Sequence, residues 1–171
     1  MMSASAERQS SDSIAGSRGT RELPSPKVLR LIMSAYPPLL FAGVRVAHIA
    51  DDWTSVRATH RVRPWNCNPN RSAFGGTLYS MTDPFFGIMA RGQLGRGYRV
   101  WTSAASIEFI APGREMVTAT MSLPSEHAAA IRDATSDGSK SITAHTTEIV
   151  SDQGVLVARA TQQLYVRRIY Q

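Results

Sequence analysis

Apolar and polar residues alternate in six stretches of the chain. The clearest lies around residue 58, where Val56, Ala58, His60 and Val62 are separated by Arg or Thr. Successive side chains of a β-strand point to opposite faces, so this alternation predicts strands with one face buried. The predicted strands are 44–51, 53–65, 99–111, 115–123, 140–150 and 155–169. In the third of these, the odd-numbered residues 101–109 are expected to share one face.

A long stretch without this alternation follows the second strand. Residues 75 to 89 or 91 are mostly apolar or hydroxyl-bearing, which predicts the main helix, buried on nearly all sides. The glycine-rich segment 92–97 is expected to end it. A shorter helix is predicted to begin at Ser25-Pro26, because proline suits the first turn of a helix. Pro37-Pro38 is expected to end this first helix.

The minor elements follow from shorter patterns. Residues 39–43 are expected to form a short turn, and residues 125–135 a short helix or an irregular excursion. The loop 67–73 contains Asn-Pro-Asn, which is typical of turns. The first helix is expected to bury an apolar stripe made of Val28, Leu29, Ile32 and Met33.

The order of these elements predicts the fold class. One helix and two strands precede the long helix, and four strands that are mostly linked as hairpins follow it. A single apolar helix against an antiparallel sheet is an α+β arrangement. A sheet of five to six strands wrapped around a long central helix is the hotdog fold. We expect residues 25–171 to form this single domain, and residues 1–24, which are rich in Ser and Arg, to be a disordered tail.

Composition narrows the classes of function. The formal net charge of +6 suits an anionic partner. The arginines are spread along the chain, however, so we expect no nucleic-acid binding. No apolar run reaches the length of a membrane span. A single cysteine fits a reducing compartment, and the first residues lack the apolar core of a secretory signal, so a cytoplasmic location is expected. The four histidines are scattered, so we expect no metal site, and no cofactor is indicated.

The segment 68–83, NPNRSAFGGTLYSMTD, carries the candidate chemistry. A polar loop runs into the pair Gly75-Gly76, which begins the long helix and offers unpaired backbone N–H groups to an oxygen from outside. Asp83 follows in an otherwise apolar stretch, where a charge is costly unless it is paired or used. An amide-lined hole and a buried carboxylate are the minimal parts for acyl transfer.

The chain resembles the hotdog-fold acyl-CoA thioesterases, particularly the phenylacetate and 4-hydroxybenzoyl-CoA type, and most of all an uncharacterised branch of that superfamily. The resemblance covers about residues 26–169. The motifs that carry it are Arg63-Pro64-Trp65-Asn66, Gly75-Gly76, Leu78-Tyr79-Ser80-Met81, Asp83-Pro84-Phe85, Tyr98 to Trp101, Ile107-Glu108-Phe109, Pro112-Gly113-Arg114 and Tyr165 to Arg168.

The resemblance implies a role for each matching position. Asp83 matches the helix carboxylate that acts as general base or nucleophile, and Gly75 the glycine whose amide polarises the thioester carbonyl. Asn68 matches a loop amide that places the carbonyl or the water, and Thr102 a strand hydroxyl that assists. The remaining positions assigned to substrate binding are Gly76, Asn66, Phe74, Ser103 (an alternative to Thr102), Arg71 and Arg99. The two arginines are candidates for the phosphates of coenzyme A.

The spacing of Gly75 and Asp83 predicts an assembly. Eight residues of a regular helix separate two positions by about 12 Å, with about 80° of rotation. An attacking atom must lie within about 3–3.5 Å of the thioester carbon, so the two residues of one chain cannot serve one carbonyl if the helix is regular. Two antiparallel copies of the helix would bring Gly75 of one chain near Asp83 of the other. We therefore expect a dimer with two interfacial sites, either alone or within a tetramer.

Two hypotheses about function follow. In the first, the protein hydrolyses an acyl-thioester, such as an acyl-CoA, at the dimer interface. In the second, it is a non-catalytic hotdog module that binds acyl-CoA or a fatty-acyl ligand. The second is motivated by Phe74, which stands where many active relatives have His before the Gly-Gly pair. Steady release of acid from an acyl-thioester would support the first hypothesis and reject the second.

Overall fold

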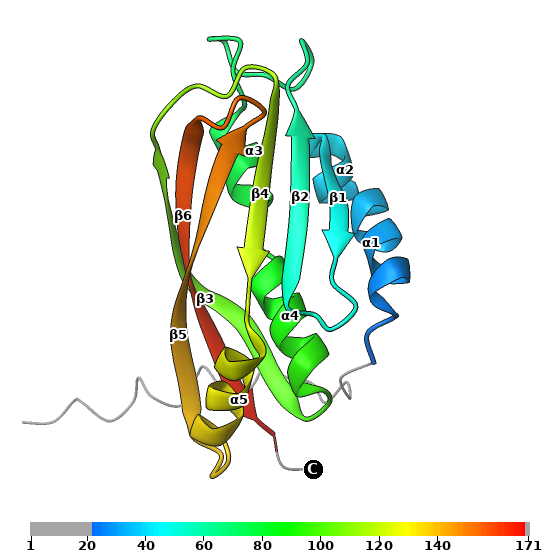
Figure 1. The fold of residues 1–171 in the computed structure, drawn as a ribbon, viewed down its shortest axis with the longest axis vertical. Helices are drawn as coiled ribbons and strands as arrows, with labels where there is room; N and C mark the ends of the chain where they lie inside the picture. The colour runs from blue at the N-terminus through cyan, green and yellow to red at the C-terminus, as the bar shows by residue number, and fades with distance from the viewer. Residues whose placement is uncertain (1–21, 170–171) are drawn as a thin grey trace, which may run out of the picture.

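The computed structural model describes residues 22–169, which form one six-stranded antiparallel sheet with helices beside it and under it (Figure 1). The predicted disordered tail lies outside the described residues except for residues 22–24. The elements are α1 (Pro26–Ala35), α2 (Pro37–Ala42), β1 (Val44–Ile49), β2 (Ser55–Arg61), α3 (Gly75–Ser80), α4 (Phe85–Leu94), β3 (Tyr98–Phe109), β4 (Met116–Ser122), α5 (Ser125–Ala134), β5 (Lys140–Ser151) and β6 (Leu156–Arg168).

The strand order in the sheet is β1-β2-β4-β5-β6-β3. All six predicted strands are present, and every neighbouring pair is antiparallel. The segment that holds α3 and α4 connects β2 to β3 at the opposite edge of the sheet, so these helices must cross it. Figure 1 shows them behind β4 and β2. The predicted hotdog architecture, a sheet wrapped around a central helical segment, is confirmed.

The core lies between α4 and the inner face of the sheet. Phe85, Phe86 and Met89 are buried almost completely. They face strands that carry small buried residues, such as Ala58 of β2 and Ala119 of β4. Small side chains let a helix approach a sheet closely, while the large ones on the helix supply the apolar area whose burial stabilises the fold.

Residues 39–43 do not form the predicted turn. They belong to α2 and its C-cap, because the pair Pro37-Pro38 occupies the first turn of a second helix instead of only ending the first. Gly43 ends α2 in the left-handed conformation, with φ of 76°, which glycine adopts without steric cost.

The apolar stripe predicted for α1 is only half buried. Leu29 and Met33 contact the core, whereas Val28 and Ile32 are each 48% exposed. The helix instead covers the β1 edge: Ser34 Oγ accepts a hydrogen bond from Val46 N at 3.2 Å and donates one to Val46 O at 3.3 Å. An edge strand covered in this way is protected from pairing with another chain.

The odd-numbered residues of β3 do not share one face along the whole strand. The pairing of β3 with β6 shifts between Thr102 and Ala104, which places a bulge at Ser103. Before the bulge, Thr102 pairs with the buried Leu164, so the even-numbered side chains point inward. After it, the odd-numbered Ile107 packs against the core. A bulge adds one residue to a strand and therefore exchanges its two faces.

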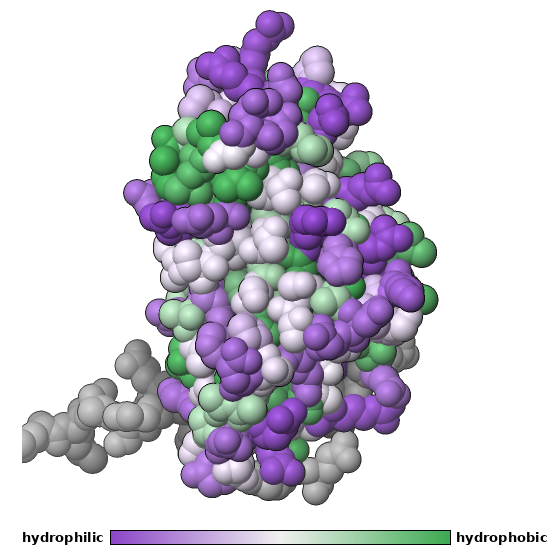
Figure 2. Space-filling model, viewed as in Figure 1, coloured by the Kyte–Doolittle hydropathy of each residue, from purple (hydrophilic) through white to green (hydrophobic). Residues whose placement is uncertain are grey.

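No helix among the described residues is long and apolar enough to cross a lipid bilayer. The face of the molecule seen in Figure 2 is a mixture of polar and apolar side chains, with one concentrated apolar patch over the β5–β6 turn and the segment that follows β3. Exposed apolar residues in these segments include Phe109, Ile110 and Val155.

Candidate active site

The predicted continuous helix from residue 75 is interrupted at residues 81–84, where four turn residues separate α3 from α4. Pro84 explains the interruption, because it has no N–H to donate to the carbonyl of Ser80 and its ring crowds that carbonyl. Thr82 closes the end of α3, since its N–H and its Oγ1 both donate to Tyr79 O, at 3.0 and 2.9 Å. Asp83 therefore stands in the break between two helices, whereas a regular helix would have placed it on a continuous surface.

Asp83 is half-buried and has few hydrogen-bond partners. Tyr79 OH donates to its Oδ1 at 3.4 Å, and Thr102 Oγ1 donates to its backbone oxygen at 3.4 Å. Burial, followed by the negative charge of Asp83 and the hydrogen bond to it, raises the pKa of Tyr79, so the phenol stays neutral and remains a donor. Among residues 22–169, no hydrogen bond is made to the second carboxylate oxygen of Asp83.

A hollow of about 570 Å³ opens beside Asp83 between α4 and β3. Its walls include Pro84 and Ile88 on the helix side, and Trp101 and Thr102 on the strand side. The bulge at Ser103 orients these strand residues: Thr102 points inward, while Ser103 Oγ donates to Gln163 O at 3.1 Å on the strand edge. Of the two hydroxyls considered from sequence, only that of Thr102 reaches Asp83.

Gln162 of β6 is a residue at this site that the sequence did not reveal. It is 1% exposed. With its amide oriented to match its neighbours, its nitrogen donates to Thr82 O at 3.3 Å and its oxygen accepts from Asp83 N at 3.2 Å. The helix break leaves these two backbone groups without helical partners, and the Gln162 amide forms a hydrogen bond with each of them. The available sequence signal was an amide at a position of the alternating pattern that is otherwise apolar, between Ala160 and Leu164.

Replacing Gln162 with Leu should lower the free energy of unfolding by about 2–4 kcal/mol, because two buried backbone groups would lose their partners. Urea unfolding monitored by circular dichroism measures the change. The matched control is Gln163→Leu, which alters the adjacent exposed residue on the other face and should change the free energy by less than about 0.5 kcal/mol. Equal effects of the two substitutions would show that the Gln162 amide does not hold the break.

Gly75 is the first residue of α3 and is not among the residues that line this hollow. A Cβ atom on Gly75 would approach the ring of Phe109 to 2.9 Å, so glycine permits this close contact. The preceding residue, Phe74, is extended, with ψ of 133°, and gives no side-chain cap to the helix. Because the first N–H groups of a helix have no helical acceptor, the Gly75 amide is available to an outside oxygen.

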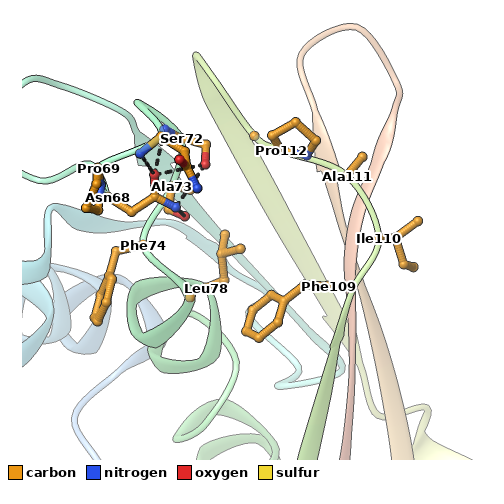
Figure 3. A pocket seen from close by; sticks show the side chains of 13 residues that line it. Asn68, Pro69, Ser72, Ala73, Phe74, Leu78, Phe109, Ile110, Ala111 and Pro112 are labelled. Carbon is orange, nitrogen blue, oxygen red and sulfur yellow. Dashed lines mark hydrogen bonds between the residues drawn. The ribbon is translucent and has the colours of Figure 1, made fainter.

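A second hollow of about 570 Å³ borders Gly75. Figure 3 shows Phe74 and Phe109 on opposite sides of the first turn of α3, with Leu78 pointing between them and the segment Ile110 to Pro112 forming the far wall. Phe74 is 56% exposed, and its ring covers Gly76, whose own Cβ would meet it at 2.6 Å. In the described part of the chain, no residue lines both hollows. Although the helix is not regular, Gly75 and Asp83 open into different spaces.

The side chain of Asn68 lines the Gly75 hollow but is engaged in its own loop (Figure 3). Its Oδ1 accepts from the backbone N–H groups of Asn70 and Ser72 at 2.9 and 3.1 Å, and its Nδ2 donates to Ser72 Oγ at 3.0 Å. The bridge between Cys67 and Ala73 closes this loop. These contacts are typical turn chemistry, so Asn68 shapes the hollow whether or not it also binds substrate.

Besides Gly76 and Ser103, three residues assigned to substrate binding line neither hollow. Asn66 ties its own turn, accepting from Arg63 N at 2.7 Å. Arg71 is exposed at the tip of the loop that follows Asn68, with φ of 57°. Arg99 is exposed near the start of β3, beside a different hollow.

The histidines stand apart from the two hollows. Burial lowers the pKa of His60, although its bond to Gly43 O opposes this shift. Burial also lowers the pKa of His145, as does the charge of His127. Within residues 22–169, no group of three or more His, Cys, Asp or Glu side chains is placed to hold a metal ion.

Comparison with known proteins places this chain in a family. A family model described as "Domain of unknown function (DUF4442)" matches residues 26–166. Among curated proteins, no sequence matches the chain.

Solved structures share the fold. A Pseudomonas aeruginosa protein of unknown function, PA5026, described as a probable thioesterase, superimposes with a TM-score of 0.74 at 16% identity, covering 88% of this chain and 99% of that one. The Haemophilus influenzae thioesterase HI1161 gives 0.64 at 14% identity, covering 87% and 94%. The PaaI protein of the Escherichia coli phenylacetic acid degradation operon gives 0.56 at 20% identity, covering 84% and 92%. At these identities the likeness establishes the fold alone.

Proposed function

The chain belongs to the DUF4442 family, within the thioesterase-like hotdog superfamily, and we propose that it hydrolyses an acyl-thioester such as an acyl-CoA at sites formed between two protomers. The observation that carries this proposal is Asp83. Its carboxylate is half-buried at a helix break, its backbone is tied to Gln162 and Thr102, and it opens on a hollow. A positioned carboxylate with a free oxygen is suited to general base or nucleophilic catalysis.

The second half of each site is the Gly75 amide of the other protomer. Two features favour such a dimer. Gly75 and Asp83 border different hollows of one chain, so each lacks the other. The sheet also has one uncovered edge among the described residues, because α1 covers β1 while β3 is the outermost strand on the other side. Pairing of β3 with a second copy would satisfy this edge and bring the two helical segments together.

At the start of the proposed reaction, the thioester carbonyl oxygen accepts a hydrogen bond from the Gly75 N–H, and the carbonyl carbon faces Asp83. With Asp83 as general base, its free oxygen takes a proton from a water molecule, whose oxygen bonds to the carbonyl carbon. The negative charge then develops on the oxygen held by Gly75. When the intermediate collapses, the C–S bond breaks and the thiolate takes the proton from Asp83. The products are a carboxylic acid and a thiol. With Asp83 as nucleophile, the carboxylate itself bonds to the carbon, the C–S bond breaks and the thiolate leaves. Water then hydrolyses the resulting anhydride, which restores the Asp83 carboxylate, and the proton released in this step goes to the thiolate.

A panel of acyl-CoA substrates tests the function. Short, long and aromatic acyl chains would be incubated with the protein, and thiol release would be followed with a disulfide reagent. Steady release that scales with protein concentration is expected for at least one acyl class. Bound acyl-CoA that is recovered intact by native mass spectrometry, with no thiol released from any substrate, would establish the binding module instead. Phe74, which is exposed beside Gly75 in place of a polar group, is the observation that favours that second candidate.

A further inference from the structure

Three basic side chains lie side by side on the outer face of the sheet, near the start of β3. Arg99 of β3 pairs with Arg167 of β6, and Arg167 pairs with Lys140 of β5. Residues paired directly across antiparallel strands point to the same side, and all three are exposed. The neighbouring Tyr98 is buried, so the three basic residues are on the face turned away from α4.

The same three strands carry a contrasting set of charges at their other end. There Arg159 of β6 lies between Glu108 of β3 and Glu148 of β5, with nitrogen–oxygen distances of 4.0 and 2.9 Å. Like charges directly opposite each other on a sheet are destabilising, whereas opposite charges stabilise it. Over residues 22–169, none of the three basic residues forms an ion pair. An anionic ligand would supply the missing compensation.

A hollow of about 440 Å³ borders this basic row, next to the segment that precedes β5. Arg167 Nε donates to Gly138 O at 3.0 Å, which holds the guanidinium against the hollow. Of the described residues that line it, Asp137 alone carries a carboxylate, and this group already accepts from Ser139 N at 2.9 Å and from Ser139 Oγ at 3.0 Å. Positive charge therefore predominates around the hollow.

An aromatic row lies next to the basic one on the same face. Trp101 pairs with Tyr165, two residues further along each strand, and Ile142 pairs with Tyr165 on the other side. The two aromatic rings are stacked, with centroids 3.9 Å apart and planes inclined by 19°. Two residues along a strand span about 6.6 Å. Trp101 is 47% exposed and Tyr165 is half-buried. An aromatic ring that is open to solvent is a suitable platform for the base of a nucleotide.

We propose that this face binds a purine nucleotide carrying two or more phosphate groups. The base stacks on the aromatic pair Trp101 and Tyr165, and the phosphates contact Arg99, Arg167 and Lys140. The extent of the patch favours a small ligand over a nucleic-acid strand. Beyond the aromatic row the same face carries the uncharged Ala104, Gln163 and Ala144.

Coenzyme A and a free nucleotide share this chemistry. Trp101 also lines the hollow that contains Asp83, so the outer face and the proposed reaction site meet at β3. Pairing of β3 with a second copy takes place within the plane of the sheet and leaves the outer face open. Assignment of the nucleotide to coenzyme A rests on the proposed function, whereas the nucleotide site itself does not.

Isothermal titration calorimetry with adenosine 3′,5′-bisphosphate, ADP and coenzyme A tests the proposal. None of these ligands has a thioester, so the result is independent of hydrolysis. The Arg99→Gln/Arg167→Gln double variant should weaken binding of the bisphosphate by at least about tenfold, the value of one charge-assisted hydrogen bond. Arg159→Gln, which removes an arginine from the same face at its other end, is the matched control and should bind as the wild type does.

The aromatic contribution has its own readout. Tyr165→Leu should weaken binding of the bisphosphate but leave binding of inorganic pyrophosphate unchanged, because only the bisphosphate carries a base. If coenzyme A binds more tightly than either nucleotide, the site is assigned to the coenzyme A part of an acyl-CoA substrate. If all three bind equally, it is assigned to a free nucleotide. The proposal is overturned if the bisphosphate does not bind, if the double variant binds it like wild type, or if a single-stranded RNA oligomer binds more tightly than all three ligands.

Discussion

Replacing Asp83 with Asn is expected to lower kcat for thioester hydrolysis by about 10²–10⁴-fold, the usual contribution of a positioned acid or base. Asparagine has the same shape and can still accept the hydrogen bond from Tyr79, but it can neither take a proton nor attack the carbonyl carbon. The backbone contacts of Asp83 with Gln162 and Thr102 should survive. Initial rates of thiol release over a range of substrate concentrations measure the effect.

The matched control for this substitution is Asp133→Asn, which makes the same chemical change at an exposed position of α5. It should leave kcat unchanged. Circular dichroism of both variants establishes that they are folded, and Asp83→Ala should be as inactive as Asp83→Asn. Unchanged turnover in both Asp83 variants would remove the carboxylate from the mechanism.

Replacing Gly75 with Pro is expected to lower kcat by about 10²–10³-fold, because proline has no N–H to hold the developing oxyanion. The substitution is compatible with the local backbone. Proline is favoured at the first position of a helix, and the preceding Phe74 already has the extended conformation that proline requires, with φ of −67° and ψ of 133°.

Gly75→Ala is the matched control for the proline variant. Both side chains meet Phe109, since any Cβ at this position would approach its ring to 2.9 Å, but alanine keeps the N–H. A large loss of activity in the proline variant with a small loss in the alanine variant would assign the effect to the amide. Equal losses would assign it to crowding by Phe109.

The two inactive variants together test whether the sites lie between protomers. When Asp83→Asn and Gly75→Pro chains are mixed and allowed to exchange, about half of the dimers contain one of each, and each of these has one intact site. Activity should therefore recover to about a quarter of the wild-type value. Mixtures that stay as inactive as the separate variants would place Gly75 and Asp83 of one chain in the same site.

Local patterns were sufficient for most of the fold. Alternation identified all six strands because each strand buries one face against the helices, which leaves a period of two in the sequence. Errors arose where a residue has two possible effects on the backbone. Pro37-Pro38 was interpreted as the end of α1, yet the same residues begin α2. The segment from Gly75 to residue 89 or 91 is predicted as one main helix, yet Pro84 separates α3 from α4 within it.

The candidate site was predicted less completely than the fold. Asp83 and Gly75 stood out because a charge and a glycine pair are unusual in an apolar helix. Gln162 could not be connected with them, since 79 positions separate it from Asp83 in the chain and only strand pairing brings β6 under the helix break. Residue type and position in predicted loops or at strand ends are the basis on which Arg71 and Arg99 are assigned to substrate phosphates, and in the structure these two arginines and Asn66 line neither hollow.

The sequence by itself determined the hotdog architecture, the family, and the candidate pair Gly75 and Asp83 with its spacing of eight residues, because these depend on periodicity and on residues close together in the chain. Only the tertiary structure decided which groups surround Asp83 and which share the outer face of the sheet. The bulge at Ser103 turns Thr102 toward Asp83, and the pairing of three strands aligns Arg99, Arg167 and Lys140. Such alignments depend on register between distant segments, which no local pattern encodes.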